Sequence, residues 1–339
     1  MKFDVTIFPD NLNNAASIAR HVESLGFSGL WTSETAHNPF FPITHAASVT
    51  QNILLGTAVA IAFPRSPMVM AQLAWDLAEQ SNGRFVLGLG TQVKQHITKR
   101  FSTEWVAPVP RLREYIESMR AIWKTFQENA SLRYGGEHYR FTLMTPFFNP
   151  GPIEHPEIPI YIAGVNEGLC RLAGEVCEGF HVHSFHTPRY LRELIIPAIE
   201  QGAQSQGRTR KDVSLNCAVF VVTGKTQDEI RDNTGFVRSQ VAFYASTPSY
   251  SPVMAMHGWQ DLHEQLNKMS REGRWSEMGD LISDDILQEF AVIAPEEDLP
   301  YAVKERYEGL LDRVGYYFPY QYQDGSKQSL WEAAAKAFA

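Results

Sequence analysis

Eight short apolar segments recur along this chain of 339 residues, and segments with helical periodicity separate them. Their β-branched and aromatic content predicts strands, and the alternation of strand with helix is typical of βα units around a parallel sheet. Eight such units favour an α/β TIM barrel, with a doubly wound open sheet as the structural alternative. The predicted strands cover residues 3–8, 29–34, 53–59, 85–90, 158–164, 180–185, 215–222 and 316–320.

Two stretches are longer than a plain barrel needs, although we expect residues 1–339 to form a single domain. Residues 104–157 include two aromatic runs joined by Gly135-Gly136, a pattern that predicts a β-hairpin. Residues 224–315 follow the seventh strand. Active sites of TIM barrels lie at the C-terminal ends of the strands, so we expect the second insertion to cover the substrate.

Charge and composition exclude several classes of partner. The formal net charge is -8, from 38 acidic and 30 basic residues, whereas proteins that bind nucleic acid need a basic face. No apolar run approaches the ~18 residues of a membrane span. The start "MKFDVTIFPD" lacks the pattern of a secretory signal, so we expect a cytoplasmic protein. The three cysteines are odd in number, and Cys170 and Cys177 lie seven positions apart on one predicted helix, which predicts reduced, buried thiols and no disulfide framework.

Two glycine-bearing strand ends are candidates for holding an anion. In "RFVLGLGTQVKQH", residues 84–96, Gly88 and Gly90 end the fourth strand, but Val93 stands where a dinucleotide fingerprint needs its third glycine. The alternative is an ordinary tight turn. Ala163 and Gly164 end the fifth strand, ahead of a helix that Asn166 can cap. Both strand ends would face the same mouth of a barrel, where their backbones could hold a phosphate.

A third feature is "LLGTAVAIAFPRSP", in which apolar residues continue past the end of the third strand. The run extends through Phe63 before Pro64 breaks it, which predicts a bulge at Ala58-Val59.

With these blocks in this order, the chain resembles the bacterial luciferase-like flavin and deazaflavin oxidoreductases along nearly its whole length. "GLGTQVKQHI" and "AFPRSP" are similar to a subgroup that depends on coenzyme F420. The resemblance implies hydride transfer between F420 and a small organic substrate, in a homodimer. The alternative within the family is a monooxygenase that uses reduced FMN.

The resemblance also implies a cofactor site. A non-prolyl cis peptide at Ala58-Val59 would lie behind the cofactor ring, and Glu34 at the end of the second strand would lie beside it. Phosphate contacts are implied for the loops after the fourth and fifth strands, with Lys94 as a charge partner unless it lies in a solvated loop. The residues expected in these two loops are Gly90, Thr91, Gln92, Lys94, Ala163, Gly164 and Val165.

The chain also departs from family patterns at two positions. Thr35 stands where luciferases and sugar-phosphate dehydrogenases of the family have a histidine after the strand 2 acid. Val93 stands where the dehydrogenases have a glutamate. We therefore expect neither light emission nor sugar-phosphate oxidation.

The candidate catalytic residues are Glu34 and His96. Glu34 would serve as an acid or base, unless an arginine or a backbone amide pairs with it, and His96 would donate a proton. The residues expected to line the substrate pocket are Phe40, Phe41 and His183. This assignment makes the protein an enzyme, although a cofactor-binding protein without catalysis remains an alternative.

A metal-dependent hydrolase is the competing hypothesis from another class of enzyme. His181 and His183 alternate onto one face of the sixth strand, and strand-end histidines can bind zinc. Glu34 is almost the only further ligand at the other strand ends, so we expect no metal.

Overall fold

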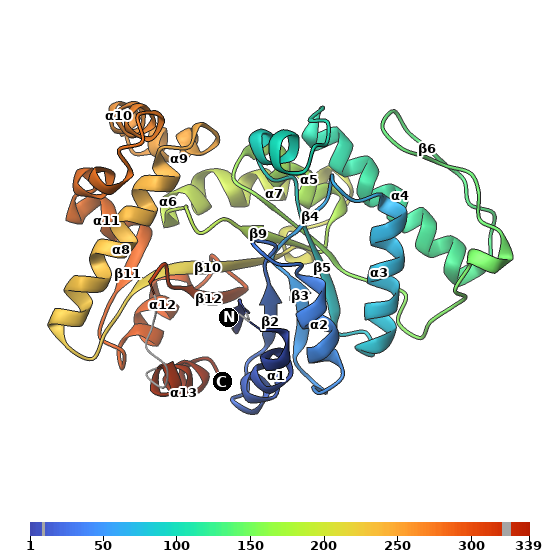
Figure 1. The fold of residues 1–339 in the computed structure, drawn as a ribbon, viewed down its shortest axis with the longest axis horizontal. Helices are drawn as coiled ribbons and strands as arrows, with labels where there is room; N and C mark the ends of the chain where they lie inside the picture. The colour runs from blue at the N-terminus through green and yellow to red at the C-terminus, as the bar shows by residue number, and fades with distance from the viewer. Residues whose placement is uncertain (9–10, 321–326) are drawn as a thin grey trace.

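The computed structural model describes residues 1–8, 11–320 and 327–339 as a closed parallel barrel of eight strands (Figure 1). The ring closes because β10 pairs with both β9 and β12, and β12 pairs with β1. This confirms the predicted TIM barrel. The barrel strands are β1 (Lys2–Ile7), β2 (Gly29–Thr32), β3 (Leu54–Thr57), β5 (Phe85–Gly90), β8 (Ile160–Gly164), β9 (Gly179–Val182), β10 (Ser214–Val222) and β12 (Arg313–Tyr317).

The helices follow sequence signals that are local. Ser66 caps α3 because its side chain accepts a hydrogen bond from the Met68 amide. Asn166 occupies the capping position of α5, but its side chain makes no capping hydrogen bond, contrary to expectation. The helices between barrel strands and at the C-terminus include α1 (Ala15–Ser24), α2 (Phe40–Ala47), α3 (Pro67–Gln80), α4 (Pro108–Glu128), α5 (Glu167–Val176), α7 (Ile196–Ser205), α12 (Leu299–Tyr307) and α13 (Lys327–Phe338).

Both insertions have structure of their own, on opposite sides of the barrel in Figure 1. The first contains the predicted hairpin, in which β6 (Tyr134–Gly135) pairs antiparallel with β7 (Arg140–Phe141). The second adds β11 (Ala291–Ile293), a strand of three residues that pairs with β10 and is too short to recognise from sequence. The α-helices of the second insertion that precede β11 are α8 (Gln227–Ala245), α9 (Ser251–Met256), α10 (Gln260–Arg271) and α11 (Asp284–Phe290).

The barrel interior is filled towards its N-terminal end by a buried ion pair and an indole ring. Arg313 donates two hydrogen bonds of 2.7 Å to the Asp4 carboxylate, which also accepts one of 2.8 Å from the Trp31 indole. A Cβ at Gly29 would lie 2.6 Å from the Arg313 guanidinium, and one at Gly56 would lie 2.4 Å from the Trp31 ring. Glycine is therefore needed on β2 and β3 to leave room for these side chains.

Two further expectations concern the cysteines and the membrane. Cys170, Cys177 and Cys217 are all buried and free, as the sequence predicts. Burial raises the pKa of the Cys170 thiol to about 12. In the part of the chain that the structure describes, no helix is long and apolar enough to cross a membrane.

Candidate active site at the mouth of the barrel

The mouth of the barrel, at the C-terminal ends of its strands, divides into two chemically different halves. Side chains on a strand alternate between its faces, so residues two positions beyond a buried interior residue face the same interior. This alternation places Ser33, Ala58, Gly90 and Ala163 at or just beyond the ends of β2, β3, β5 and β8, and we call them the small-residue half. The same alternation places His183 just beyond β9, and Phe220 and Tyr317 near the ends of β10 and β12. With Tyr244 and Tyr250 of the second insertion, these three residues form the aromatic half.

The small-residue half brings together the ends of β2, β3 and β5, which are distant in the sequence. The Ala58–Val59 peptide is cis, as the family resemblance implies. The Ser33 hydroxyl donates to the Ala58 carbonyl at 2.6 Å, and the Glu34 amide donates to the Val59 carbonyl at 3.3 Å. A Cβ at Gly90 would lie 2.6 Å from the Val59 side chain. The end of β5 therefore packs directly on the bulge after β3, and this contact by itself requires glycine at position 90.

Glu34 is engaged in an ion pair beside the bulge. Arg65 donates hydrogen bonds of 2.7 and 2.8 Å to its two carboxylate oxygens, and the Ile61 amide donates another of 2.7 Å. The Glu34 side chain is only 8% exposed and that of Arg65 18%. The pairing that the sequence left open is thus present. Arg65 lies in the quoted "AFPRSP" block, but the sequence gives no sign of its partner.

The loop after β5 is partly buried at its start and exposed further on. Thr91 is buried, and Gln92 has a left-handed backbone (φ +59°) with its side chain accepting from the Val93 amide. Lys94 and His96 are exposed, and neither side chain has a hydrogen bond or ion pair within the described residues. Residues His96–Arg100 form a π-helical turn, and Arg100 of this turn donates to the Thr35 carbonyl in the loop after β2. Lys94, Lys99 and Arg100 are exposed cationic residues of this segment.

The end of β8 contributes small residues to the same half. Ala163 is half-buried at the mouth. A Cβ at Gly164 would lie 2.7 Å from the Leu169 side chain, so packing against α5 already accounts for this glycine. The Val165 carbonyl accepts a hydrogen bond from the Tyr190 hydroxyl at 3.2 Å.

The aromatic half is centred on His183. The Phe185 amide donates to its Nδ1 at 3.0 Å, and its Nε2 lies 3.2 Å from the Tyr250 hydroxyl. The rings of Tyr244 and Tyr250 pack on the imidazole, with centroids 4.8 and 4.7 Å away. Burial lowers the pKa of His183 to about 4 and raises the pKa of Tyr250 to about 12, so both groups are neutral near pH 7. Sequence analysis found His183 but missed both tyrosines, which have no recognisable pattern in the insertion.

Three other candidate residues belong to neither half as defined above. Phe40 is buried in the core with Arg65 above its ring, whereas its neighbour Phe41 is exposed on α2. His181 lies deeper in the barrel than His183, against the Trp31 ring and 3.3 Å from the Asn216 amide nitrogen. Among residues 1–8, 11–320 and 327–339, no group of three His, Cys, Asp or Glu side chains could hold a metal ion.

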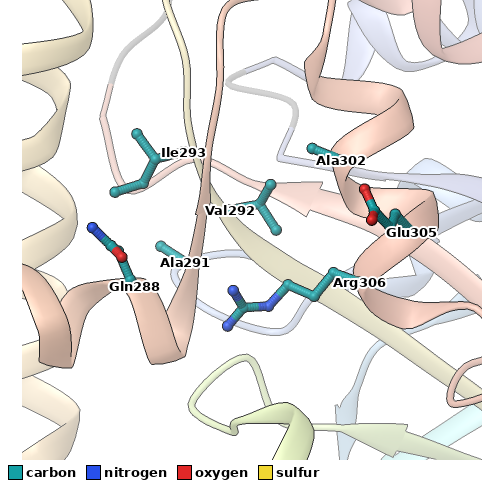
Figure 2. A pocket seen from close by; sticks show the side chains of 7 residues that line it. All are labelled: Gln288, Ala291, Val292, Ile293, Ala302, Glu305 and Arg306. Carbon is teal, nitrogen blue, oxygen red and sulfur yellow. The ribbon is translucent and has the colours of Figure 1, made fainter.

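A groove outside the barrel is separate from the mouth. It has a volume of about 560 Å³ and lies between β11 and α12. Figure 2 shows Arg306 extending from α12 towards the residues of α11 and β11. None of the candidate site residues lines this groove, which is bordered by Gln288, Ala291, Val292, Ile293, Ala302, Glu305 and Arg306.

Comparison with known proteins agrees with this architecture. The model of the luciferase-like monooxygenase family matches residues 1–313. An uncharacterized protein of Mycobacterium tuberculosis is 42% identical over 314 residues, which cover 93% of this chain and 92% of the relative. A putative coenzyme F420-dependent oxidoreductase of the same species is 27% identical, with 83% of each chain covered.

Among solved structures, the coenzyme F420-dependent tetrahydromethanopterin reductase of Methanopyrus kandleri has the same fold. Its TM-score is 0.76 at 18% identity, and the match covers 99% of this chain and 97% of the reductase. The relatives and structural neighbours thus include F420-dependent oxidoreductases, within a family described by its monooxygenases. By the extent of the family match and by its 42% identical relative, this chain belongs to the luciferase-like monooxygenase family.

Proposed function

We propose that this protein is an oxidoreductase that binds coenzyme F420 on the small-residue half and a small organic substrate over the aromatic half. The observation that carries the proposal is the division of one barrel mouth into these two surfaces. Ligand sites in general pair an apolar wall with a few polar groups that fix the orientation of the ligand. The 27% identical putative F420-dependent oxidoreductase supports the choice of cofactor.

The residues of the small-residue half fit a flat ring system. Ala58 and Ala163 carry only methyl groups, and Gly90 between their strands carries no side chain. Thr91, Gln92 and Val165 would hold the phosphate through their backbones, and Lys94 would contribute charge. Glu34 would lie beside the ring and keep the bulge in place, because its carboxylate accepts hydrogen bonds from both Arg65 and the Ile61 amide.

A bound deazaflavin would supply hydride transfer, which none of the protein's own side chains can perform. The chain's part is to hold the ring against the bulge, to exclude water and to orient the substrate. His96, which is exposed at the start of the π-helical turn after β5, is the proposed proton donor.

Titration of the purified protein with F420 and, separately, with FMN tests the proposal through cofactor fluorescence. We expect F420 to bind with a dissociation constant below about 100 μM, in the usual range for small-molecule sites. Preferential binding of FMN would instead favour a reduced-FMN-dependent monooxygenase. If neither cofactor binds, the proposed function is wrong. The proposed homodimer is tested by light scattering on the same sample.

A further inference from the structure

The hydrogen bonds of His183 determine which of its ring nitrogens carries the proton. The Phe185 amide can only donate, and it lies 3.0 Å from Nδ1, so Nδ1 must accept and carries no hydrogen. Burial keeps the imidazole neutral near pH 7, and a neutral imidazole has one N–H. The proton is therefore on Nε2, which faces the Tyr250 hydroxyl at 3.2 Å.

This tautomer determines the direction of the next hydrogen bond. Nε2–H donates, so the Tyr250 oxygen accepts, and the hydroxyl hydrogen of Tyr250 is left to donate elsewhere. No acceptor for it occurs among residues 1–8, 11–320 and 327–339. Tyr250 precedes α9 in the second insertion, yet its hydroxyl meets a residue that directly follows β9, at the C-terminal end of the barrel. A hydrogen-bond donor is thus held at the mouth.

The surroundings of this donor restrict the chemical class of its acceptor. Burial alone shifts the pKa values of His183 and Tyr250, and no charged side chain contributes to either shift. The neighbours that pack on the pair are aromatic, namely Tyr244 and Phe185. Within the described part of the chain, no cation contributes at this site to compensate a carboxylate or a phosphate, whose burial would be costly. It suits a neutral molecule with one accepting oxygen.

We propose that Tyr250 is the hydrogen-bond donor that recognises a neutral carbonyl or hydroxyl oxygen of the substrate, and that His183 is the residue that positions it. This proposal rests on the proposed function, in which the substrate lies over the aromatic half, beside a cofactor on the small-residue half. The chain of donors runs from the Phe185 amide through His183 to Tyr250 and ends at the substrate oxygen. It assigns a role to the second insertion.

The first test is nitrogen NMR of protein labelled at its 11 histidines, loaded with whichever cofactor binds. The His183 signals are assigned by their loss in His183→Gln. We expect an imidazole protonated at Nε2 and not at Nδ1, and unchanged between pH 6 and pH 8, because its pKa lies at about 4. A proton on Nδ1 would contradict the proposal.

The second test uses neutral ketones of increasing size as probes: acetone, cyclohexanone and acetophenone. We expect at least one to shift the His183 Nε2 signal at millimolar concentration. In methylenecyclohexane a CH₂ group replaces the carbonyl oxygen of cyclohexanone. We expect it to bind about three- to tenfold more weakly than cyclohexanone, which corresponds to the net free energy of one hydrogen bond. The proposal is overturned if no ketone shifts the signal, or if the ketone and its hydrocarbon analogue bind equally.

Variants identify the donor. Tyr250→Phe should abolish the preference for the ketone, whereas Tyr301→Phe, on the exposed face of α12, should keep it. His183→Leu should weaken the preference, and His183→Gln should restore part of it, because an amide can accept from Phe185 and donate to Tyr250. A preference that survives in Tyr250→Phe would refute the assignment, provided that circular dichroism shows the variant folded.

Failure of this inference can be told apart from failure of the proposed function. Cofactor titration does not depend on Tyr250, so cofactor binding without ketone recognition would reject only the donor role. If no cofactor binds, the NMR and ketone experiments are carried out on the protein alone, where they still decide the tautomer and the preference.

Discussion

The Glu34 carboxylate and the Arg65 guanidinium form a two-point ion pair, with N–O distances of 2.7 and 2.8 Å, beside the Ala58–Val59 bulge. The same carboxylate accepts the Ile61 amide, so one side chain links the end of β2 to the segment after β3. These three donors hold the carboxylate in one orientation. We therefore propose a positioning role for Glu34 at the small-residue half of the mouth.

Removing one partner of this pair should destabilise the protein and weaken cofactor binding together. Arg65→Met leaves a mostly buried carboxylate without its cation, and we expect a loss of about 3 kcal/mol in the free energy of unfolding. Glu34→Gln should cost a similar amount, and the double variant less than the sum. Urea unfolding and cofactor titration measure both effects. Additive losses would show that the two residues act independently.

The buried Asp4–Arg313 ion pair inside the barrel should contribute to the free energy of unfolding and not to substrate specificity. Both side chains are nearly inaccessible, so Asp4→Asn leaves an uncompensated guanidinium and should cost about 3 to 5 kcal/mol. Asp284→Asn, which breaks an exposed pair with Arg238, is the matched control and should cost under about 1 kcal/mol. Urea unfolding of the two variants measures the loss in the free energy of unfolding. Equal losses in both variants would contradict a stabilising role for the buried pair.

Buried histidines should make the protein less stable in mild acid. Burial holds the pKa of His186 at about 4 and that of His181 at about 3, below the usual value near 6.5. As the pH falls from 6.5 towards 4, the unfolded chain takes up protons that the folded protein cannot, so the free energy of unfolding decreases.

His186→Asn isolates one of these contributions. The asparagine amide can still donate to the His183 carbonyl, as the His186 Nδ1 does at 2.9 Å, but it does not titrate. We expect the pH dependence of unfolding between pH 4.5 and 6 to become less steep by up to about 1.4 kcal/mol per pH unit. Urea unfolding at several pH values measures the slope, and an unchanged slope would mean that His186 is protonated in the folded protein.

A larger side chain on the small-residue half should block the cofactor without unfolding the protein. Ala163→Leu adds bulk at a half-buried position on the proposed ring surface, and we expect cofactor affinity to fall at least about tenfold, that is by ~1.4 kcal/mol. Gly90 is unsuitable for this test because any side chain there collides with Val59. Ala130→Leu, in an exposed loop, is the control. Unchanged affinity in Ala163→Leu would move the cofactor away from β8.

Local patterns predicted the barrel strands well, because each strand is apolar over its own length and is bounded by turn residues. The ends were less accurate. The last strand was expected at residues 316–320 but begins at Arg313, since a charged residue there reads as a loop until Asp4 is known to pair with it. Asn166 precedes its helix as expected, yet whether a side chain caps depends on its rotamer, which sequence does not specify.

The sequence by itself determined the order of strands and helices, the glycines at the mouth and, through its family resemblance, the bulge at Ala58–Val59. Only the tertiary structure decided that Glu34 pairs with Arg65, that Gly90 packs on Val59 and that Tyr250 meets His183. These contacts join residues 31 to 67 positions apart, and their strength depends on distances that barrel closure sets. The order of strands and helices follows from local propensity, which the sequence carries. The long-range contacts follow from proximity in the folded barrel, which only the tertiary structure shows.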